Sequence, residues 1–227
     1  MASQALEDYL KIIYKLESYA PSGKGVQTSA IAERLSISQA SVSNMLKKLS
    51  DKTYIEYAPY YGVKLTESGR KIALNMVRKH RILEQYLVER LGYSWDEVDE
   101  EAEVLEHSIS DKLANRMWDV LGQPTHDPHG SPIPTENGTV MDNNWCALSS
   151  IDTQQTFLLR RIKNRRPEEL RYLASIGLTT GALVMVKSFA PMEGPLMVLI
   201  DNSEIHAIDY QLAKSLMVGE ISEIRQA

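Results

Sequence analysis

The spacing of apolar residues changes once along this 227-residue chain, and that change limits the folds available to it. Up to about residue 121, apolar residues recur three or four positions apart, which predicts amphipathic helices. Residues 122–145 are rich in Pro, Gly, Asn and Asp and predict a loop between domains. Short apolar runs follow, separated by Gly, Pro and Asn-Ser, and these predict strands. We therefore expect a mainly α-helical protein with a small β-barrel at its C-terminal end.

The first third of the chain has the element order of a winged helix-turn-helix. Apolar spacing predicts helices over about 4–19, 28–35 and 39–52, the second capped by Thr28 or Ser29 and the third by Ser38. The runs TYIEYA and VKLT, on either side of a turn around Tyr60–Gly62, predict a small hairpin. In this order of elements, the second helix of the motif, here the third of the chain, enters the major groove of DNA.

The predicted recognition helix carries side chains that suit DNA. Its N-terminal part has small hydroxyl and amide groups, which can approach base edges, and lysines that can contact phosphates follow. The predicted DNA-binding residues are Thr28, Ser38, Gln39, Ser41, Ser43, Asn44, Lys47, Lys48 and Lys64. Any three-helix cap on a larger protein can show this spacing, but the hairpin and the polar face of the helix favour DNA binding.

The distribution of charge is consistent with this prediction, although the net charge is −5. Residues 1–90 carry 14 Lys and Arg against 9 Asp and Glu, whereas residues 91–154 carry 2 against 13. Because attraction to phosphate decays over roughly 8–10 Å, the charge of the domain matters more than that of the chain. The acidic middle is either a cation site or a solvated acidic surface.

Two longer helices are expected over about 68–91 and 95–121, and the second carries a candidate metal site. Glu103, Glu106 and His107 stand at i, i+3 and i+4, so they share one helix face. Two carboxylates and one imidazole provide hard oxygen donors and a borderline nitrogen. This set of donors suits Mn²⁺ or Fe²⁺.

A second set of candidate ligands is spread over the preceding helix and the loop. His80 and Glu84 are spaced i, i+4 beside apolar positions, where burying an unpaired charge would cost roughly several kcal/mol. Either a cation or a simple His–Glu hydrogen bond would satisfy them. Asp127 and His129, in the loop sequence HDPHG, offer two further donors.

Composition narrows the class of protein. The single cysteine, Cys146, excludes an intrachain disulfide framework, and no apolar run is long enough to span a membrane. Glu7 and Asp8 stand where a signal peptide would be basic and then apolar, so a cytoplasmic protein is expected. A metallohydrolase would need a substrate pocket, of which the sequence shows no sign, so an enzyme is not expected. Two further classes compete with a metal sensor: a winged-helix regulator that senses an organic ligand or redox state, and a dimeric scaffold.

Five segments together resemble the diphtheria-toxin repressor family of iron- and manganese-dependent repressors. They are EDYLKIIYKLE, VRKHRILEQYLVERLGY, EEAEVLEHSISD, DPHGSPIP and IGLTTGALVMV. The resemblance covers the whole chain and implies three domains: a winged helix-turn-helix over 1–75, a helical metal-binding and dimerisation domain over 76–145, and a Src-homology-3-like barrel over 146–227. It also implies a homodimer that, with metal bound, binds palindromic operators and represses metal-uptake genes.

The resemblance also implies which residues bind metal. The primary site falls on Asp8, Glu103, Glu106 and His107, and a second site falls on His80, Glu84, Asp127 and His129. Iron sensors of the family have a methionine in place of Asp8 and a cysteine in place of Glu103. The resemblance is therefore to the manganese-responsive branch, with Mn²⁺ as the expected metal and Fe²⁺ as the alternative. Lys11 stands where some short manganese sensors have a glutamate, which argues against their closely spaced two-metal cluster.

Overall fold

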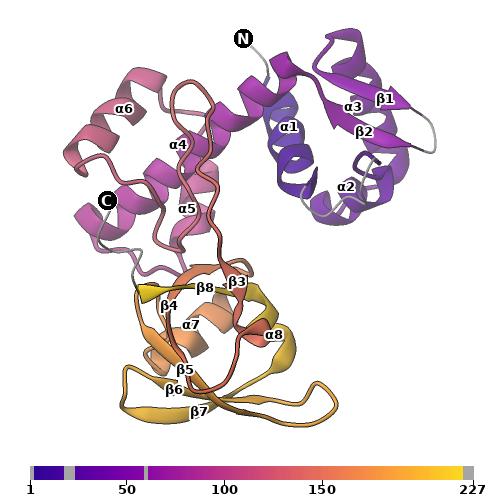
Figure 1. Ribbon diagram of the computed structural model, residues 1–227. Coiled ribbons are helices and arrows are strands. Elements are labelled where there is room, and N and C mark those ends of the chain that lie inside the picture. The colour runs from indigo at the N-terminus through magenta and orange to yellow at the C-terminus, as the bar shows by residue number, and fades with distance from the viewer. Residues whose placement is uncertain (1–2, 18–23, 59–60, 222–227) are drawn as a thin grey trace. The chain divides into compact units, whose positions relative to one another are not determined.

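The computed structural model describes residues 3–17, 24–58 and 61–221 (Figure 1). The helices are α1 (Gln4–Glu17), α2 (Thr28–Leu35), α3 (Gln39–Asp51), α4 (Glu67–Leu91), α5 (Val98–Leu105), α6 (Asp111–Val120), the 3-10 helix η1 (Leu148–Ser150), α7 (Pro167–Ser175) and α8 (Tyr210–Ser215). The strands are β1 (Ile55–Ala58), β2 (Gly62–Leu65), β3 (Cys146–Ala147), β4 (Thr156–Ile162), β5 (Leu183–Phe189), β6 (Leu196–Ile200), β7 (Glu204–Ile208) and β8 (Leu216–Gly219).

Contacts divide the chain into two compact units. The first comprises Met1–His80, Glu106–Asp111 and Pro134–Val140, and the second comprises Arg81–Leu105, Lys112–Ile133 and Met141–Ala227. None of the described helices combines the length and the apolar character that crossing a bilayer requires.

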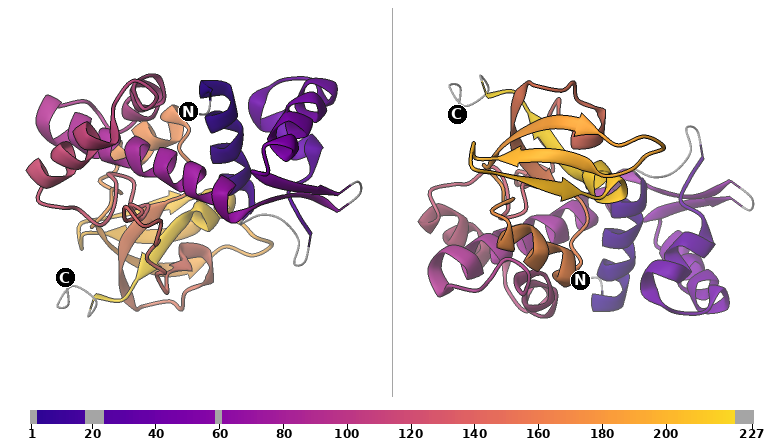
Figure 2. Two further views of the ribbon diagram at one scale, coloured as in Figure 1. Left: turned by 90° about the horizontal axis from the view of Figure 1, so that it is seen from above. Right: turned by 90° about the horizontal axis from the view of Figure 1, so that it is seen from below.

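In the first unit, α1, α2 and α3 pack with the β1–β2 hairpin around one apolar core (Figure 1 and Figure 2). Fully buried side chains in this core are Leu10, Ile13, Ile31, Val42, Leu46, Leu49 and Val63. The hairpin is antiparallel, and Val63 of β2 also bridges to Val26. The predicted order of three helices followed by a hairpin is confirmed.

The helix caps agree with the sequence at one position and differ at another. Ser38 caps α3 as predicted, because its Oγ accepts a hydrogen bond from the amide of Ser41 at 3.2 Å. The predicted cap of α2 by Thr28 or Ser29 is wrong. Thr28 is already the first helical residue, and Gln27 occupies the cap position without a side-chain cap hydrogen bond. Residues 18–19, at the end of the first predicted helix, and Tyr60, in the predicted hairpin turn, lie outside the described residues.

The helix predicted over 95–121 is two helices, α5 and α6. Glu106 and His107 lie in the turn between them. Lys79 of α4 donates a hydrogen bond to the carbonyl oxygen of Ile109 at 3.0 Å and pairs with Asp111 at 2.8 Å. Contacts with another helix therefore stabilise the break, while the apolar spacing continues through it and predicts one helix.

The second unit contains a six-stranded antiparallel sheet in the order β3-β8-β4-β5-β6-β7. The four apolar runs that predict strands form β4, β5, β6 and β7, whereas β3, β8 and α8 were not predicted. Side chains of the sheet, of α7 and of α8 share one buried core. Within the described residues, β3 pairs only with β8 and β7 only with β6, so the sheet is open. The predicted small β-barrel is corrected to an open antiparallel sheet, in which the edge strand β3 is only two residues long and is not paired with β7 at the other edge.

Candidate metal centre and DNA-binding surface

The predicted DNA-binding side chains gather mainly on one face of α3. Gln39, Ser41, Asn44, Lys47 and Lys48 are exposed, and Val42, Leu46 and Leu49 are buried on the opposite face. Lys64 is exposed on β2, whereas Thr28 and Ser43 are partly buried. Two of the predicted groups make local contacts: the Ser43 hydroxyl donates to the carbonyl oxygen of Gln39, and Ser38 caps the helix. An exposed polar face on a helix that follows a short turn is what base reading requires.

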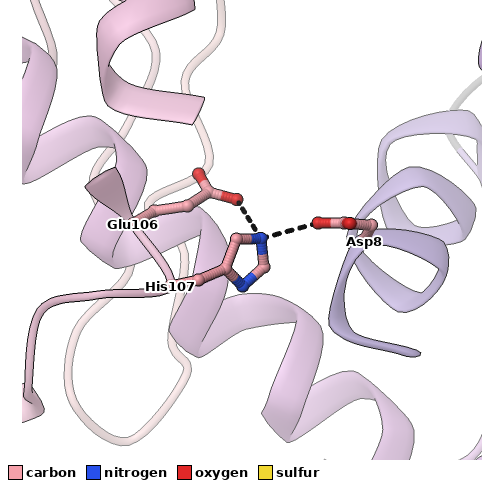
Figure 3. A group of neighbouring side chains, drawn as sticks. All are labelled: Asp8, Glu106 and His107. Carbon is pink, nitrogen blue, oxygen red and sulfur yellow. Dashed lines mark hydrogen bonds and ion pairs between the residues drawn. The ribbon is translucent and has the colours of Figure 1, made fainter. Parts of the chain in front are cut away.

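Asp8, Glu106 and His107 form the first cluster (Figure 3). Asp8 lies on α1, and the other two residues lie in the turn after α5. Nε2 of His107 is 2.7 Å from Oδ1 of Asp8 and 3.6 Å from Oε1 of Glu106. One ligand atom from each residue lies within 4.8 Å of the others, a spacing at which a single cation can be bound. The sequence predicted all three residues.

Glu106 is the most buried carboxylate of the first cluster, and both of its oxygens have partners. Oε2 lies 2.7 Å from Nδ1 of His80, and Oε1 lies 2.5 Å from Nζ of Lys11. Burial alone would raise the pKa of Glu106, but the hydrogen bond with His80 and the positive charge of Lys11 lower it below its ordinary value. The carboxylate is therefore ionised at neutral pH.

Glu7 orients the imidazole of the first cluster. Its Oε2 lies 3.0 Å from Nδ1 of His107. A neutral ring that donates its Nδ1–H to Glu7 presents the lone pair of Nε2 toward Asp8 and Glu106, as metal ligation requires. Sequence reasoning missed this role of Glu7, and the only local signal is its place next to Asp8.

The donors of the first cluster fit a divalent cation by charge as well as by type. Glu7, Asp8 and Glu106 bring three negative charges around His107, and Lys11 brings one positive charge. With the imidazoles of His80 and His107 neutral, these groups leave an excess of two negative charges, which a divalent cation would neutralise. Glu103, the fourth predicted ligand, is exposed on α5 in the second unit, and its role stays a prediction.

Glu84, Asp127, His129 and Arg165 form the second cluster, within the second unit. Glu84 lies on α4, Asp127 and His129 lie in the loop after α6, and Arg165 lies between β4 and α7. Nη1 of Arg165 is 2.7 Å from Oε1 of Glu84, and Nη2 is 2.7 Å from Oδ2 of Asp127. The first three residues also offer ligand atoms within 4.8 Å of one another. His80, predicted to join them, has Glu106 of the first cluster as its carboxylate partner.

The loop sequence HDPHG fixes two of these donors. Oδ1 of Asp127 accepts hydrogen bonds from the amides of His129 at 3.0 Å and Ser131 at 2.8 Å, which leaves Oδ2 for Arg165. Gly130 has a φ of +83°, and a Cβ at this position would lie 1.8 Å from the carbonyl oxygen of Arg160. The backbone can therefore pass this point only with glycine.

His129 presents one particular nitrogen to the second cluster. Its Nε2 lies 2.7 Å from the carbonyl oxygen of Trp95, and its ring is stacked on the Trp95 indole. A carbonyl can only accept, so Nε2 carries a proton, and in the neutral ring Nδ1 has the lone pair. Nδ1 lies 3.4 Å from Oε1 of Glu84.

Comparison with known families divides the chain into three matched segments. Residues 1–63 match the N-terminal DNA-binding domain of iron-dependent repressors, and residues 66–135 match their metal-binding and dimerisation domain. Residues 146–220 match the FeoA domain.

Individual relatives agree with these matches. The iron-dependent repressor IdeR of Mycobacterium tuberculosis is 38% identical over 128 residues, 56% of this chain and 54% of IdeR, so the chain spans about half the length of this curated relative. The transcriptional regulator MntR of Oceanobacillus iheyensis is 35% identical over 124 residues, 53% of this chain and 80% of MntR.

A solved structure agrees over nearly the whole length. It is a manganese-dependent transcriptional repressor in complex with manganese, 38% identical, with a TM-score of 0.86 over 95% of this chain and 100% of that one. Together with the matched segments, this likeness shows that the chain belongs to the family of iron-dependent repressors, which are metal-dependent repressors of transcription.

Proposed function

We propose that this protein is a cytoplasmic, metal-activated repressor of transcription. It binds operator DNA as a homodimer and controls metal-uptake genes. The observation that carries the proposal is the convergence of Asp8, from α1, with Glu106 and His107 in a cluster of metal-ligand size. The same unit exposes the polar face of α3. IdeR and MntR are regulators of transcription, which supports a regulator and not an enzyme.

The first cluster suggests how metal and DNA binding are coupled. A bound divalent cation would supply positive charge and coordinate bonds among the three ligands. Asp8 lies on α1, which packs against α2 and β2, so fixing Asp8 to Glu106 and His107 also fixes the DNA-binding elements. In the dimer, this sets the separation of the two α3 helices for half-sites about one DNA turn, roughly 34 Å, apart. By linkage, metal and DNA must strengthen each other's binding by the same factor.

Mn²⁺ is the metal that we propose, with Fe²⁺ as the alternative. The ligand atoms of the first cluster are carboxylate oxygens and an imidazole nitrogen, a set without the sulfur donors of iron sensors. The similar solved repressor is described as manganese-dependent, whereas IdeR is described as iron-dependent. Mn²⁺ binds weakly in the divalent series, so its selection would depend on site geometry and on supply.

The homodimer has support from exposed apolar side chains on α5 and α6. Val104 of α5 and Leu113 and Val120 of α6 are large apolar side chains exposed to solvent, and all three lie in the second unit. This region lies within the segment that matches the family's metal-binding and dimerisation domain. Exposed apolar side chains on neighbouring helices are typical of protein interfaces.

The domain boundaries that we propose are 1–75, 76–145 and 146–227.

Retention of DNA from a pool of randomised duplexes tests the proposal. We expect the protein to enrich a palindromic sequence in Mn²⁺ and to release it when a chelator is added. The double variant Gln39→Ala, Asn44→Ala should lose the enriched DNA while it still binds metal, and Glu33→Ala, an exposed change on α2, should behave as the unmodified protein. Equal retention in chelator and in Mn²⁺ would contradict metal activation.

A further inference from the structure

The second cluster already contains a cation in contact with two of its candidate metal ligands. The Arg165 guanidinium contacts Oε1 of Glu84 and Oδ2 of Asp127, each at 2.7 Å, and the hydroxyl of Ser131 at 2.8 Å. The same Glu84 oxygen lies 3.4 Å from Nδ1 of His129. The guanidinium therefore occupies one oxygen of each carboxylate that would bind a metal ion together with His129.

Apart from the partly exposed Asp99, the charges of the second cluster also balance without metal. Glu84 and Asp127 are buried and bring two negative charges, while Arg165 and Arg81 bring two positive charges, with Nε of Arg81 3.7 Å from Oδ2 of Asp127. Asp99, partly exposed, lies 3.5 Å from Arg165. A divalent ion here would leave excess positive charge in a buried place, which is strongly unfavourable.

Arg165 keeps its charge in this environment. Burial alone would lower the pKa of its guanidinium, but the negative charges of Asp127, Glu84 and Asp99 raise the pKa above its ordinary value. Two charge-assisted hydrogen bonds to separate carboxylates also hold the guanidinium in one orientation. Arg165 thus joins α4 to the loop of Asp127 as a metal ion would.

We infer that Arg165 is the resident cation of the second cluster, so that the protein binds one divalent metal ion per chain, at the first cluster. Glu84, Asp127 and His129 form a latent site that takes a metal ion only when Arg165 is removed. The lone pair of His129 Nδ1 completes the donor set of this latent site. The inference rests on the proposed metal binding at the first cluster and differs from the family resemblance, which implies two sites.

Equilibrium dialysis against Mn²⁺, followed by metal analysis, tests the inference. We expect one Mn²⁺ per chain for the unmodified protein and two for Arg165→Gln. The matched control is Arg166→Gln, the neighbouring arginine, whose side chain is 68% exposed and pairs with Glu169; it should bind one. The melting temperature of Arg165→Gln should fall in chelator and recover in Mn²⁺, whereas that of Arg166→Gln should match the unmodified protein in both.

Two results would overturn the inference. The first is a folded Arg165→Gln that still binds one Mn²⁺. The second is an unmodified protein that binds two and loses one in His129→Gln, a measurement that decides the matter even if Arg165→Gln fails to fold. Failure of the proposed function is separate: it would show as Mn²⁺ retained by Asp8→Asn, which we expect to bind none.

Discussion

The two clusters have similar donors but are neutralised differently. Each combines carboxylates with an imidazole whose second nitrogen is held by a neighbour, Glu7 at His107 and the carbonyl of Trp95 at His129. Among the described residues, the first cluster has one permanent cation, Lys11, and keeps an excess of negative charge, whereas two guanidinium groups balance Glu84 and Asp127 in the second. Donor type and spacing therefore do not define a metal site, because the number of built-in cations decides whether a metal ion is needed.

The two clusters also differ in their access to solvent, and the first cluster is the more accessible. The side chain of Asp8 is 32% exposed, so an ion can reach the first cluster. The side chains of Glu84, Asp127 and His129 in the second cluster are 0% exposed. A metal site needs a path from solvent as well as ligands. The second cluster is therefore suited to structural support and the first to sensing.

The largest expected effect is a loss of stability when the internal cation of the first cluster is removed. Lys11→Met removes the ammonium that is paired with Glu106, and both side chains are at most 1% exposed. We expect the free energy of unfolding in chelator to fall by about 3–5 kcal/mol, because a buried carboxylate loses its cation. Mn²⁺ should then stabilise this variant more than the unmodified protein.

Chemical denaturation in chelator and in Mn²⁺ measures both effects. Lys52→Met, which replaces an exposed lysine, is the control and should leave the free energy of unfolding nearly unchanged. If Lys11→Met and Lys52→Met were equally stable in chelator, Lys11 would not be the internal cation of the first cluster.

The second-largest effect is expected on Mn²⁺ binding when Asp8, the proposed metal ligand on α1, is removed. Asp8→Ala should weaken Mn²⁺ binding by about 100-fold or more, since the loss of even an outer partner of a ligand costs about 10–100-fold. Metal-dependent DNA binding should be lost with it, while the protein stays folded in chelator. Titration with Mn²⁺ in a DNA-binding assay measures the change. A variant that responded to Mn²⁺ normally would show that α1 is not tethered through Asp8.

The sequence predicted the parts of these clusters that local spacing or a family pattern reveals. Short spacings predict Ser38 as a helix cap and the set Glu103, Glu106 and His107, of which the first cluster contains Glu106 and His107. Arg165 could not be predicted, because it is 81 positions from Glu84 and no period connects the two. The break between α5 and α6 was missed for the same reason, since Lys79 of α4 stabilises it. Contacts between segments far apart in the sequence thus determine whether the carboxylates and imidazoles face a site for a metal ion or a built-in cation.

A smaller effect is expected from the neighbour that orients His107. Glu7→Ala should weaken Mn²⁺ binding by about 10-fold, because the imidazole loses the acceptor that fixes its tautomer. Glu7→Gln keeps an acceptor oxygen and should recover most of the affinity. Comparing the two variants by metal titration separates orientation of the ring from loss of charge. If Glu7→Gln were as weak as Glu7→Ala, the charge of Glu7 would be what matters.

The smallest effect on stability is expected for an exposed ion pair. It gives a reference value against which the buried pair of Lys11 and Glu106 can be compared. Asp111 pairs with Lys79 at 2.8 Å and with Asn75 at 3.1 Å, but its side chain is 68% exposed. Asp111→Ala should therefore lower the free energy of unfolding by less than about 1 kcal/mol at neutral pH.

The pH dependence of this small effect has a defined sign. Hydrogen bonds from Lys79, and then from Asn75, hold the pKa of Asp111 below its ordinary value of 3.8. Its contribution is thus fully present above that value and is lost as the pH falls through the lower, folded-state pKa. Denaturation at neutral and progressively acidic pH should show the difference from Asp111→Ala vanish only in acid. A difference that was already lost near neutral pH would mean that another group is responsible.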